Sequence, residues 1–180
     1  QLGAFARAVE AYRTVLEAEP GHPDALQLLG PALERLGDAK GAMAACQAAL
    51  DVLPHSGQLH YRLALLLRRG GDLQGSVAAC RRAIEADPRR PNPHVSLGAD
   101  LATLGDRGGA IAALRAALGA VAPRAEAYCN IAVALENQDD LDGAVAGYRA
   151  ALREDPGHDL AQRSLDSLLC RPRAETPATG

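Results

Sequence analysis

The sequence predicts an all-α fold, a right-handed α-solenoid of about ten helices arranged as antiparallel pairs. Two signals repeat along its 180 residues with a period of 34 residues. The first is a proline, which occurs at Pro20, Pro54, Pro88 and Pro156. At position 122, where the period would place a further proline, the sequence reads Ala122-Pro123. The second is a turn signature, which reads Gly37-Asp38, Gly71-Asp72 and Gly105-Asp106, and changes to Asp139-Asp140 in the last unit. Two breaks in each period imply two helices in each period.

Helical spacing between the breaks predicts one buried stripe on each helix. Apolar residues recur every three or four positions, as in Leu26, Leu29 and Leu33. Glycine suits the left-handed backbone at a helix end, and aspartate accepts hydrogen bonds from the free N–H groups that begin the next helix. Because a Gly-Asp pair closes one helix and opens another within two residues, we expect the two helices of a unit to run antiparallel.

Composition narrows both the kind of core and the kind of partner. Apolar residues make up 48% of the chain and charged residues 23%, but aromatic residues only 3%, and tryptophan is absent. Alanine, leucine and valine must therefore fill the core, which favours closely packed helices. The formal charge of −3 gives no general attraction to nucleic acid or anionic membranes. The longest apolar run, Leu63 to Leu67, is far shorter than the roughly 20 residues that cross a bilayer. We expect a cytoplasmic protein with no nucleic-acid or membrane partner.

The repeating residues resemble those of the tetratricopeptide-repeat family. Its pattern is Trp-x2-Leu-Gly-x2-Tyr, then Ala-x3-Phe, then a closing proline. The first whole unit carries Leu26, Leu29, Gly30, Leu33, Ala42, Cys46, Ala49 and Pro54 in these slots, and the next three units carry comparable residues. Small residues recur where the two helices of a unit would cross, at Gly30, Ala64, Gly98 and Ala132. The resemblance covers almost the whole chain, and it implies a scaffold that binds proteins rather than an enzyme.

The period divides the chain into seven segments. Residues 1–22, which begin with Gln1, would be the second helix of a truncated repeat, so that one apolar flank of this helix is exposed. Four whole units would follow, at residues 23–56, 57–90, 91–124 and 125–158. Residues 159–170 would form a capping helix, with Leu165 and Leu169 buried and the polar Asp166 at the crossing slot. Residues 171–180 would be a disordered tail.

Pro31 breaks the pattern, because it falls inside an expected helix. A proline there removes one backbone hydrogen bond and costs about 3 kcal/mol relative to alanine. We therefore predict a kink between Gln27 and Pro31.

No residue set predicts catalysis, a cofactor or a metal. Cys46 and Cys80 lie one period apart in buried slots, so their Cα atoms would be about 8–10 Å apart, beyond the reach of a disulfide. We expect all four cysteines to be reduced and mostly core-filling. His60 and His94 are also one stacking step apart, too far to share a zinc ion, so partial burial is expected. The remaining histidines follow closing prolines and are interpreted as solvated loop residues: His22, His55 and His158.

A binding surface is predicted on the first helix of each unit, opposite the buried stripe. Three rows of residues repeat there every 34 positions, and we call them the groove rows because they would line the concave face of the array. They are Leu28, Arg62, Ser96 and Asn130; Pro31, Leu65, Ala99 and Val133; and Arg35, Arg69, Thr103 and Asn137. The middle row is apolar and the flanking rows are polar, which suits an extended peptide or a partner helix. The arginines predict an acidic ligand segment near Arg62 and Arg69, although they could equally be simple solvated side chains.

Three functions compete at this stage. The first is a protein-interaction scaffold that binds a peptide or partner segment. The second is the non-catalytic arm of a larger protein, since residues 24–30 and 125–130 resemble the repeat arms of bacterial O-linked N-acetylglucosaminyltransferase-like proteins. The third is RNA recognition by helical repeats, which the negative charge and the apolar middle row disfavour. A role in membrane assembly, as in the repeat lipoproteins of pilus biogenesis, stays open.

Overall fold

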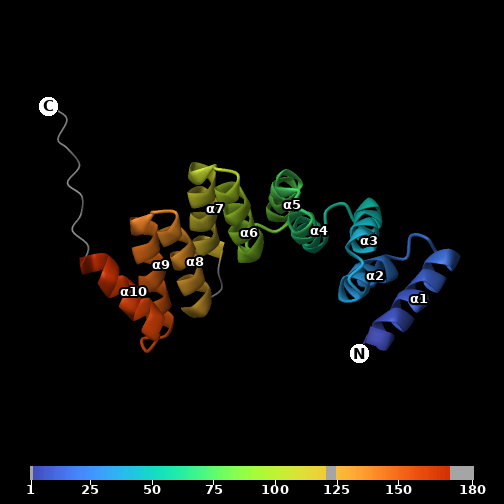
Figure 1. Ribbon diagram of the computed structural model, residues 1–180, viewed down its shortest axis with the longest axis horizontal. Helices are drawn as coiled ribbons and strands as arrows, with labels where there is room; N and C mark the ends of the chain where they lie inside the picture. Colours follow the sequence, from blue (N-terminus) through green and yellow to red (C-terminus); the bar gives the residue numbers. More distant parts are fainter. Residues whose placement is uncertain (1, 121–124, 171–180) are drawn as a thin grey trace.

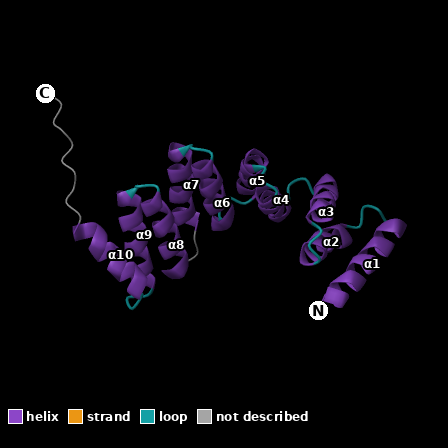
Figure 2. Ribbon diagram, in the orientation of Figure 1, coloured by secondary structure: helices purple, strands orange, loops and turns teal. Residues whose placement is uncertain are grey.

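The chain forms an elongated stack of helices. The computed structural model describes residues 2–120 and 125–170, and within these ranges it is all-helical, which confirms the predicted fold class. The helices follow one another along the long axis, and α1 and α10 lie at opposite ends of the array (Figures 1 and 2). Their bounds are α1 Leu2–Ala18, α2 Pro23–Arg35, α3 Ala39–Val52, α4 Gly57–Arg69, α5 Leu73–Ala86, α6 Pro91–Thr103, α7 Arg107–Ala120, α8 Ala125–Asn137, α9 Leu141–Glu154 and α10 Asp159–Cys170.

The Gly-Asp turns have the predicted geometry. Gly37, Gly71 and Gly105 have φ values of 80°, 86° and 86°, in the left-handed region that an L side chain disfavours. In the last turn Asp139 takes this conformation instead, with φ at 60°. The following aspartates accept a hydrogen bond from the backbone N–H three residues later; these bonds are 2.8 Å for Asp38, 2.8 Å for Asp72, 2.9 Å for Asp106 and 3.3 Å for Asp140. Each cap of this kind stabilises its helix by about 1 kcal/mol.

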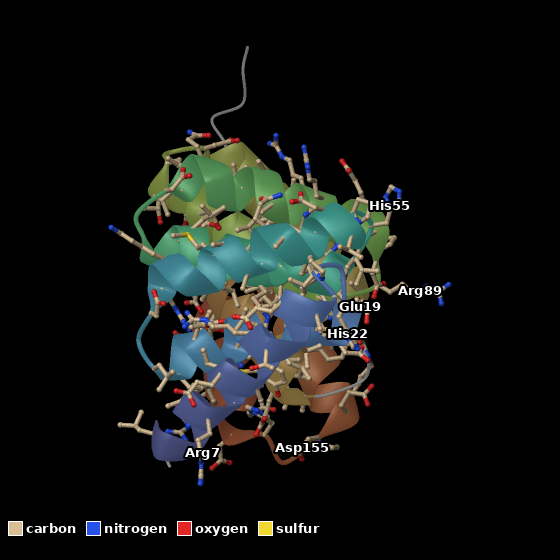
Figure 3. All side chains as sticks on the ribbon, turned by 90° about the vertical axis from the view of Figure 1, so that its right-hand side faces the viewer. Arg7, Glu19, His22, His55, Arg89 and Asp155 are labelled. Atoms are coloured by element: carbon tan, nitrogen blue, oxygen red, sulfur yellow. The ribbon has the colours of Figure 1, made fainter. Side chains whose placement is uncertain are left out.

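Histidines hold the loops between units. His60 Nε2 donates to the Pro54 carbonyl over 2.8 Å, and His94 Nε2 makes the same bond to Pro88 over 3.1 Å, so both rings are buried and tie the first helix of a unit to the preceding loop. The interpretation of the loop histidines as merely solvated is wrong at two positions. His22 Nδ1 accepts from the Ala25 N–H, and His158 Nδ1 caps α10 in the same way. His55 is exposed and projects outward on the same side of the array as Arg89 (Figure 3).

Alanines form the centre of the core, as the composition predicted. Those with no exposed surface include Ala42, Ala49, Ala64, Ala83, Ala110, Ala117, Ala132, Ala144 and Ala151. The crossing slots are correspondingly tight. A Cβ added at Gly98 would lie 2.8 Å from Leu114 Cγ, and one added at Gly147 would lie 2.8 Å from Ala132 Cβ. The third whole unit therefore has its glycine on the first helix, facing Leu114, and the fourth has its glycine on the second helix, facing Ala132.

The terminal helices differ in what they expose. On α1 only Val9 is buried, and Val15 is 38% exposed, although the equivalent alanines of later units are fully covered. On α10 the prediction for Leu165 is confirmed, but the one for Leu169 is wrong. Leu169 is 57% exposed, and Leu168 is buried in its place. The reason is that α10 packs mainly against α9, and no helix among the described residues covers its other flank.

Pro31 is accommodated within α2, which is helical without interruption from Pro23 to Arg35. The residue before a proline normally avoids the helical conformation, because its Cβ and N–H collide with the proline ring. That residue is Gly30, which has no Cβ. The glycine therefore removes part of the strain, and the kink itself stays a prediction.

Other expectations fall outside the described part of the chain. Residues 121–124 and 171–180, which include the predicted end of the third whole unit and the predicted disordered tail, are not among the described residues. Within the described ranges, no helix is long and apolar enough to cross a membrane.

Candidate functional site

The groove rows are mostly accessible in the structure. The exposed members are Leu28, Arg35, Arg69, Ala99, Thr103, Asn130 and Asn137, and the half-buried ones are Pro31, Arg62, Leu65 and Val133. Ser96 is the exception. It was expected on an accessible row, but it is only 6% exposed, because Arg68 and Tyr61 lie over it.

The arginines of α4 already have an acidic partner. Arg62 Nη1 donates to one oxygen of Glu34, and Arg69 Nη1 donates to the other, each over 3.1 Å. Glu34 is 19% exposed, whereas Arg62 is 29% and Arg69 68% exposed. One carboxylate thus offsets part of the charge of two guanidinium groups. This arrangement weakens the hypothesis that these arginines recruit an acidic ligand, and sequence reasoning missed Glu34 as their partner.

A second polar cluster lies between the units of α4 and α6. Asp100 is 2% exposed and accepts hydrogen bonds from Ser76 Oγ over 2.6 Å and from Arg68 Nη2 over 3.1 Å. Arg68 Nε lies 2.6 Å from the second Asp100 oxygen, an ion-pair contact without hydrogen-bond alignment. Arg68 Nη2 also donates to the Ser96 carbonyl over 2.7 Å. The cluster links three helices and leaves little of Arg68 available for a ligand.

Arg35 is also engaged inside the molecule. Its guanidinium carbon lies 5.1 Å from the centre of the Phe5 ring, a cation–π contact that joins α2 to α1. The three arginines of the groove rows thus all contact other side chains of the chain.

A hollow of about 230 Å³ lies where α4, α6 and α8 come together. Its walls are mainly apolar, with Val95, Ile131 and Ala127 among them, and it is lined by two predicted groove residues, Ser96 and Asn130. The other lining residues are Tyr61, Pro91 and Asn92. Small-molecule sites usually measure about 300–1,000 Å³, so this hollow fits one side chain better than a cofactor.

The polar groups around the hollow keep hydrogen-bonding capacity. Ser96 Oγ donates to Tyr61 Oη over 3.4 Å, which leaves the tyrosine O–H able to donate elsewhere. The side-chain amides of Asn92 and Asn130 have no hydrogen-bond partner among the residues that the structure describes. Two amides and one hydroxyl can bind the N–H and C=O groups of an extended peptide.

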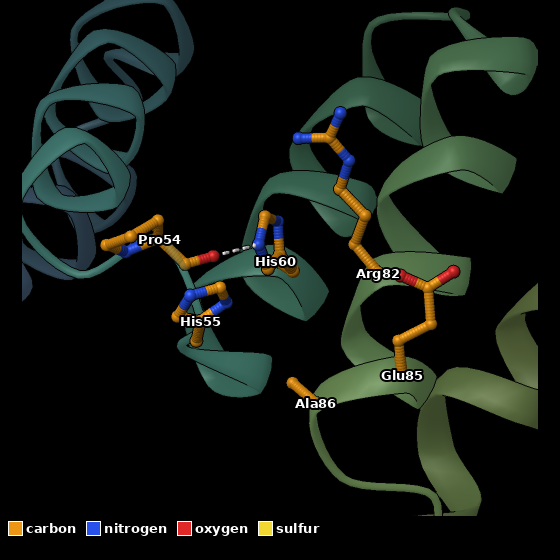
Figure 4. A pocket seen from close by; sticks show the side chains of 6 residues that line it. All are labelled: Pro54, His55, His60, Arg82, Glu85 and Ala86. Carbon is orange, nitrogen blue, oxygen red and sulfur yellow. Dashed lines mark hydrogen bonds between the residues drawn. The ribbon is translucent and has the colours of Figure 1, made fainter.

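A second hollow, of about 360 Å³, lies between the α3–α4 loop and α5 (Figure 4). Its polar residues are His55, His60, Arg82 and Glu85. His60 is already bonded to the Pro54 carbonyl. No group of three or more possible metal ligands occurs within residues 2–120 and 125–170, and this hollow contains no member of the groove rows.

The cysteines have the properties of core residues. All four are free; Cys46, Cys80 and Cys129 are buried, and Cys170 is exposed. Burial raises the pKa of Cys46 and of Cys80 to about 11, so neither is a thiolate at neutral pH. The prediction of reduced, mostly core-filling cysteines is therefore confirmed.

Comparison with protein families decides the relationship. A model described as tetratricopeptide repeat matches residues 1–55, 47–91 and 96–159, most of the chain. The chain belongs to the tetratricopeptide-repeat family. No match is found among curated protein sequences.

Solved structures of tetratricopeptide-repeat proteins have the same fold. A crystal structure of MamA matches with a TM-score of 0.72 at 25% identity, covering 86% of this chain and 90% of MamA. TTC0263, a thermophilic TPR protein of Thermus thermophilus, matches with a TM-score of 0.61 at 25% identity, covering 93% and 92% of the two chains. YrrB, described as a TPR protein with an unusual peptide-binding site, matches with a TM-score of 0.66 at 21% identity, covering 91% and 84%. These matches show that the chain has the fold of a tetratricopeptide-repeat array.

Proposed function

We propose that this tetratricopeptide-repeat chain is a protein-interaction scaffold that binds a peptide or partner segment along the groove rows. The observation that carries the proposal is the hollow between α4, α6 and α8, since it joins two groove residues from different units into one recessed, mainly apolar surface. Extended peptides bind such surfaces through main-chain hydrogen bonds and side-chain pockets. YrrB, which has the same fold, is described as having a peptide-binding site.

The test is affinity capture with the whole chain as bait and lysate of its native cells. Ala99, which is exposed in the middle row, would be changed to arginine to block the groove without disturbing the core. Ala78→Arg supplies the matched control. Ala78 is an exposed alanine on α5, so its replacement adds the same charge outside the groove rows. A partner bound by the wild type and by Ala78→Arg, but lost with Ala99→Arg, supports the proposal. Partners that all three baits retain would contradict it.

The alternative, an arm of a glycosyltransferase, has no support in the matches reported above. MamA, TTC0263 and YrrB are described without mention of such an enzyme. We therefore keep the scaffold as the proposed function, and the arm stays an untested alternative.

A further inference from the structure

We infer that the hollow between the α3–α4 loop and α5 binds a small zwitterion, a free amino acid, whose carboxylate lies against Arg82 and whose ammonium group lies against Glu85. The site is separate from the groove rows, because none of their residues lines it. The inference therefore goes beyond the proposed function and does not depend on it.

The hollow has two walls that come from different elements. Its volume is about 360 Å³, within the range of about 300–1,000 Å³ that is usual for small-molecule sites. One wall is held in place by a hydrogen bond, since His60 Nε2 donates to the Pro54 carbonyl over 2.8 Å and the ring is only 6% exposed. The residues of the two walls face each other in Figure 4: Pro54, His55 and His60 from the loop and α4, and Arg82, Glu85 and Ala86 from α5.

Both charged side chains of this hollow lack a partner within the described part of the chain. Arg82 and Glu85 are exposed and lie three positions apart on α5, a spacing that allows an ion pair. No ion pair or hydrogen bond joins them, and neither has another partner among the described residues. Asp87 and Arg90, which have the same spacing, do form an ion pair over 3.2 Å. The two charges on the wall of the hollow are thus both available to a ligand.

The repeat shows that this pair of charges is not needed for stacking. The loop-binding histidine recurs in the next unit, where His94 makes the same bond to the Pro88 carbonyl. The charges do not recur. The positions of Arg82 and Glu85 are occupied by Thr14 and Glu17 on α1, Ala48 and Asp51 on α3, Ala116 and Gly119 on α7, and Ala150 and Arg153 on α9. Among these second helices, α5 alone carries opposite charges at both positions.

The opposite charges determine which ligand fits. A guanidinium group can donate two parallel hydrogen bonds to a carboxylate, and a carboxylate accepts hydrogen bonds from an ammonium group. An anion alone would be repelled by Glu85 and a cation alone by Arg82, whereas a zwitterion avoids both penalties. The two residues lie within one helical turn, so the charges of the ligand must also be close together, as they are in an α-amino acid. Pro54 and Ala86 offer apolar surface to its side chain.

The test titrates the whole chain with each of the twenty free L-amino acids by isothermal titration calorimetry at low ionic strength. We expect at least one of them to bind with a dissociation constant below about 1 mM. Its N-acetyl derivative lacks the cation, and its amide lacks the carboxylate. Each should bind at least about fivefold more weakly, because one charged hydrogen-bonding group is lost.

Variants of the protein give the matching result. Arg82→Gln and Glu85→Gln should each weaken binding at least about fivefold. In Arg82→Gln the amide should bind as well as the free amino acid, because the carboxylate has lost its partner. Arg81→Gln and Glu154→Gln are the matched controls, since both residues are exposed and neither lines the hollow. The groove variant Ala99→Arg should also leave the affinity unchanged, and circular dichroism confirms that each variant is folded.

Three results would overturn the inference. The first is that none of the amino acids binds at concentrations up to about 10 mM. The second is that acetate or phosphate binds as tightly as the amino acid and depends on Arg82 alone, which would make the hollow an anion site. The third is that Arg82→Gln and Glu85→Gln keep full affinity, which would place the bound amino acid elsewhere on the chain. None of these results bears on the groove scaffold, which the capture experiment with Ala99→Arg tests separately.

Discussion

Replacing Gly98 by alanine should destabilise the protein, because the two helices of its unit cross at this glycine. The added Cβ would lie 2.8 Å from Leu114 Cγ, 3.1 Å from its Cδ2 and 3.2 Å from the Ala110 carbonyl oxygen. Leu114 is 3% exposed and cannot move aside freely. Overpacking of this kind costs about 1–3 kcal/mol. The higher helix propensity of alanine offsets about 0.5–1 kcal/mol of this cost. We therefore expect a net loss of about 1 kcal/mol in the free energy of unfolding.

Gly119 provides the matched control. It lies within α7, and an added Cβ would meet no atom within 4 Å. Gly119→Ala should therefore raise the free energy of unfolding by up to about 0.5–1 kcal/mol through helical preference alone. Urea denaturation followed by circular dichroism measures both changes. The m values must also agree, because repeat arrays can lose two-state behaviour.

A double variant tests the assigned cause. Earlier units carry cysteine at the place of Leu114, and the unit of α4 pairs Ala64 with Cys80. In a Leu114→Cys background the clash is relieved, so Gly98→Ala should become neutral or stabilising. If Gly98→Ala is as stable as the wild type on its own, or equally destabilising in both backgrounds, the crossing argument is wrong.

Three further measurements follow from the polar and thiol groups. Asp100→Ala leaves Arg68 without its buried carboxylate and should lower the free energy of unfolding by about 2–3 kcal/mol. This loss is smaller than the one expected for a fully enclosed ion pair, because Arg68 is 31% exposed. A loss below about 1 kcal/mol, measured by urea denaturation, would contradict the prediction. The hydrogen bond from Arg115 lowers the pKa of Asp140, so this pair contributes stability above the unfolded aspartate pKa of about 3.9 and loses it as the pH falls through the lower folded value. Arg115→Gln should therefore flatten the acid side of the curve of melting temperature against pH, and an unchanged curve would refute the assignment. With a disulfide reagent, Cys170 should react at once and the three buried thiols only after unfolding, whereas fast reaction of several thiols would show that the core opens readily.

The fold could be predicted because the same helix-ending and helix-capping signals repeat every 34 residues. The capping aspartate recurs in all four turns within the units and the turn glycine in three of them, so an error in one unit is corrected by the others. The wrong predictions of burial concern residues at the end of the repeat array and residues that a neighbouring side chain covers where solvent was expected. Leu169 is exposed because no further described helix covers α10, and Ser96 is buried because Arg68 and Tyr61 cover it. His22 and His158 cap helices through Nδ1, a local hydrogen bond that hydrophobic periodicity does not report.

The polarity of the proposed binding surface was harder to predict, because it depends on side-chain pairs that no single unit contains. Counting the arginines of α4 suggests a basic surface, yet the carboxylate that meets Arg62 and Arg69 comes from the preceding unit. Such pairs become predictable once the offsets of 28 and 35 residues are known. Ala102 occupies the place of Glu34 two units later, and the same offsets lead from it to Asn130 and Asn137, which have no hydrogen-bond partner among the described residues. In a stack of nearly identical units, the polarity of the groove rows therefore depends on which residue of the preceding unit faces them.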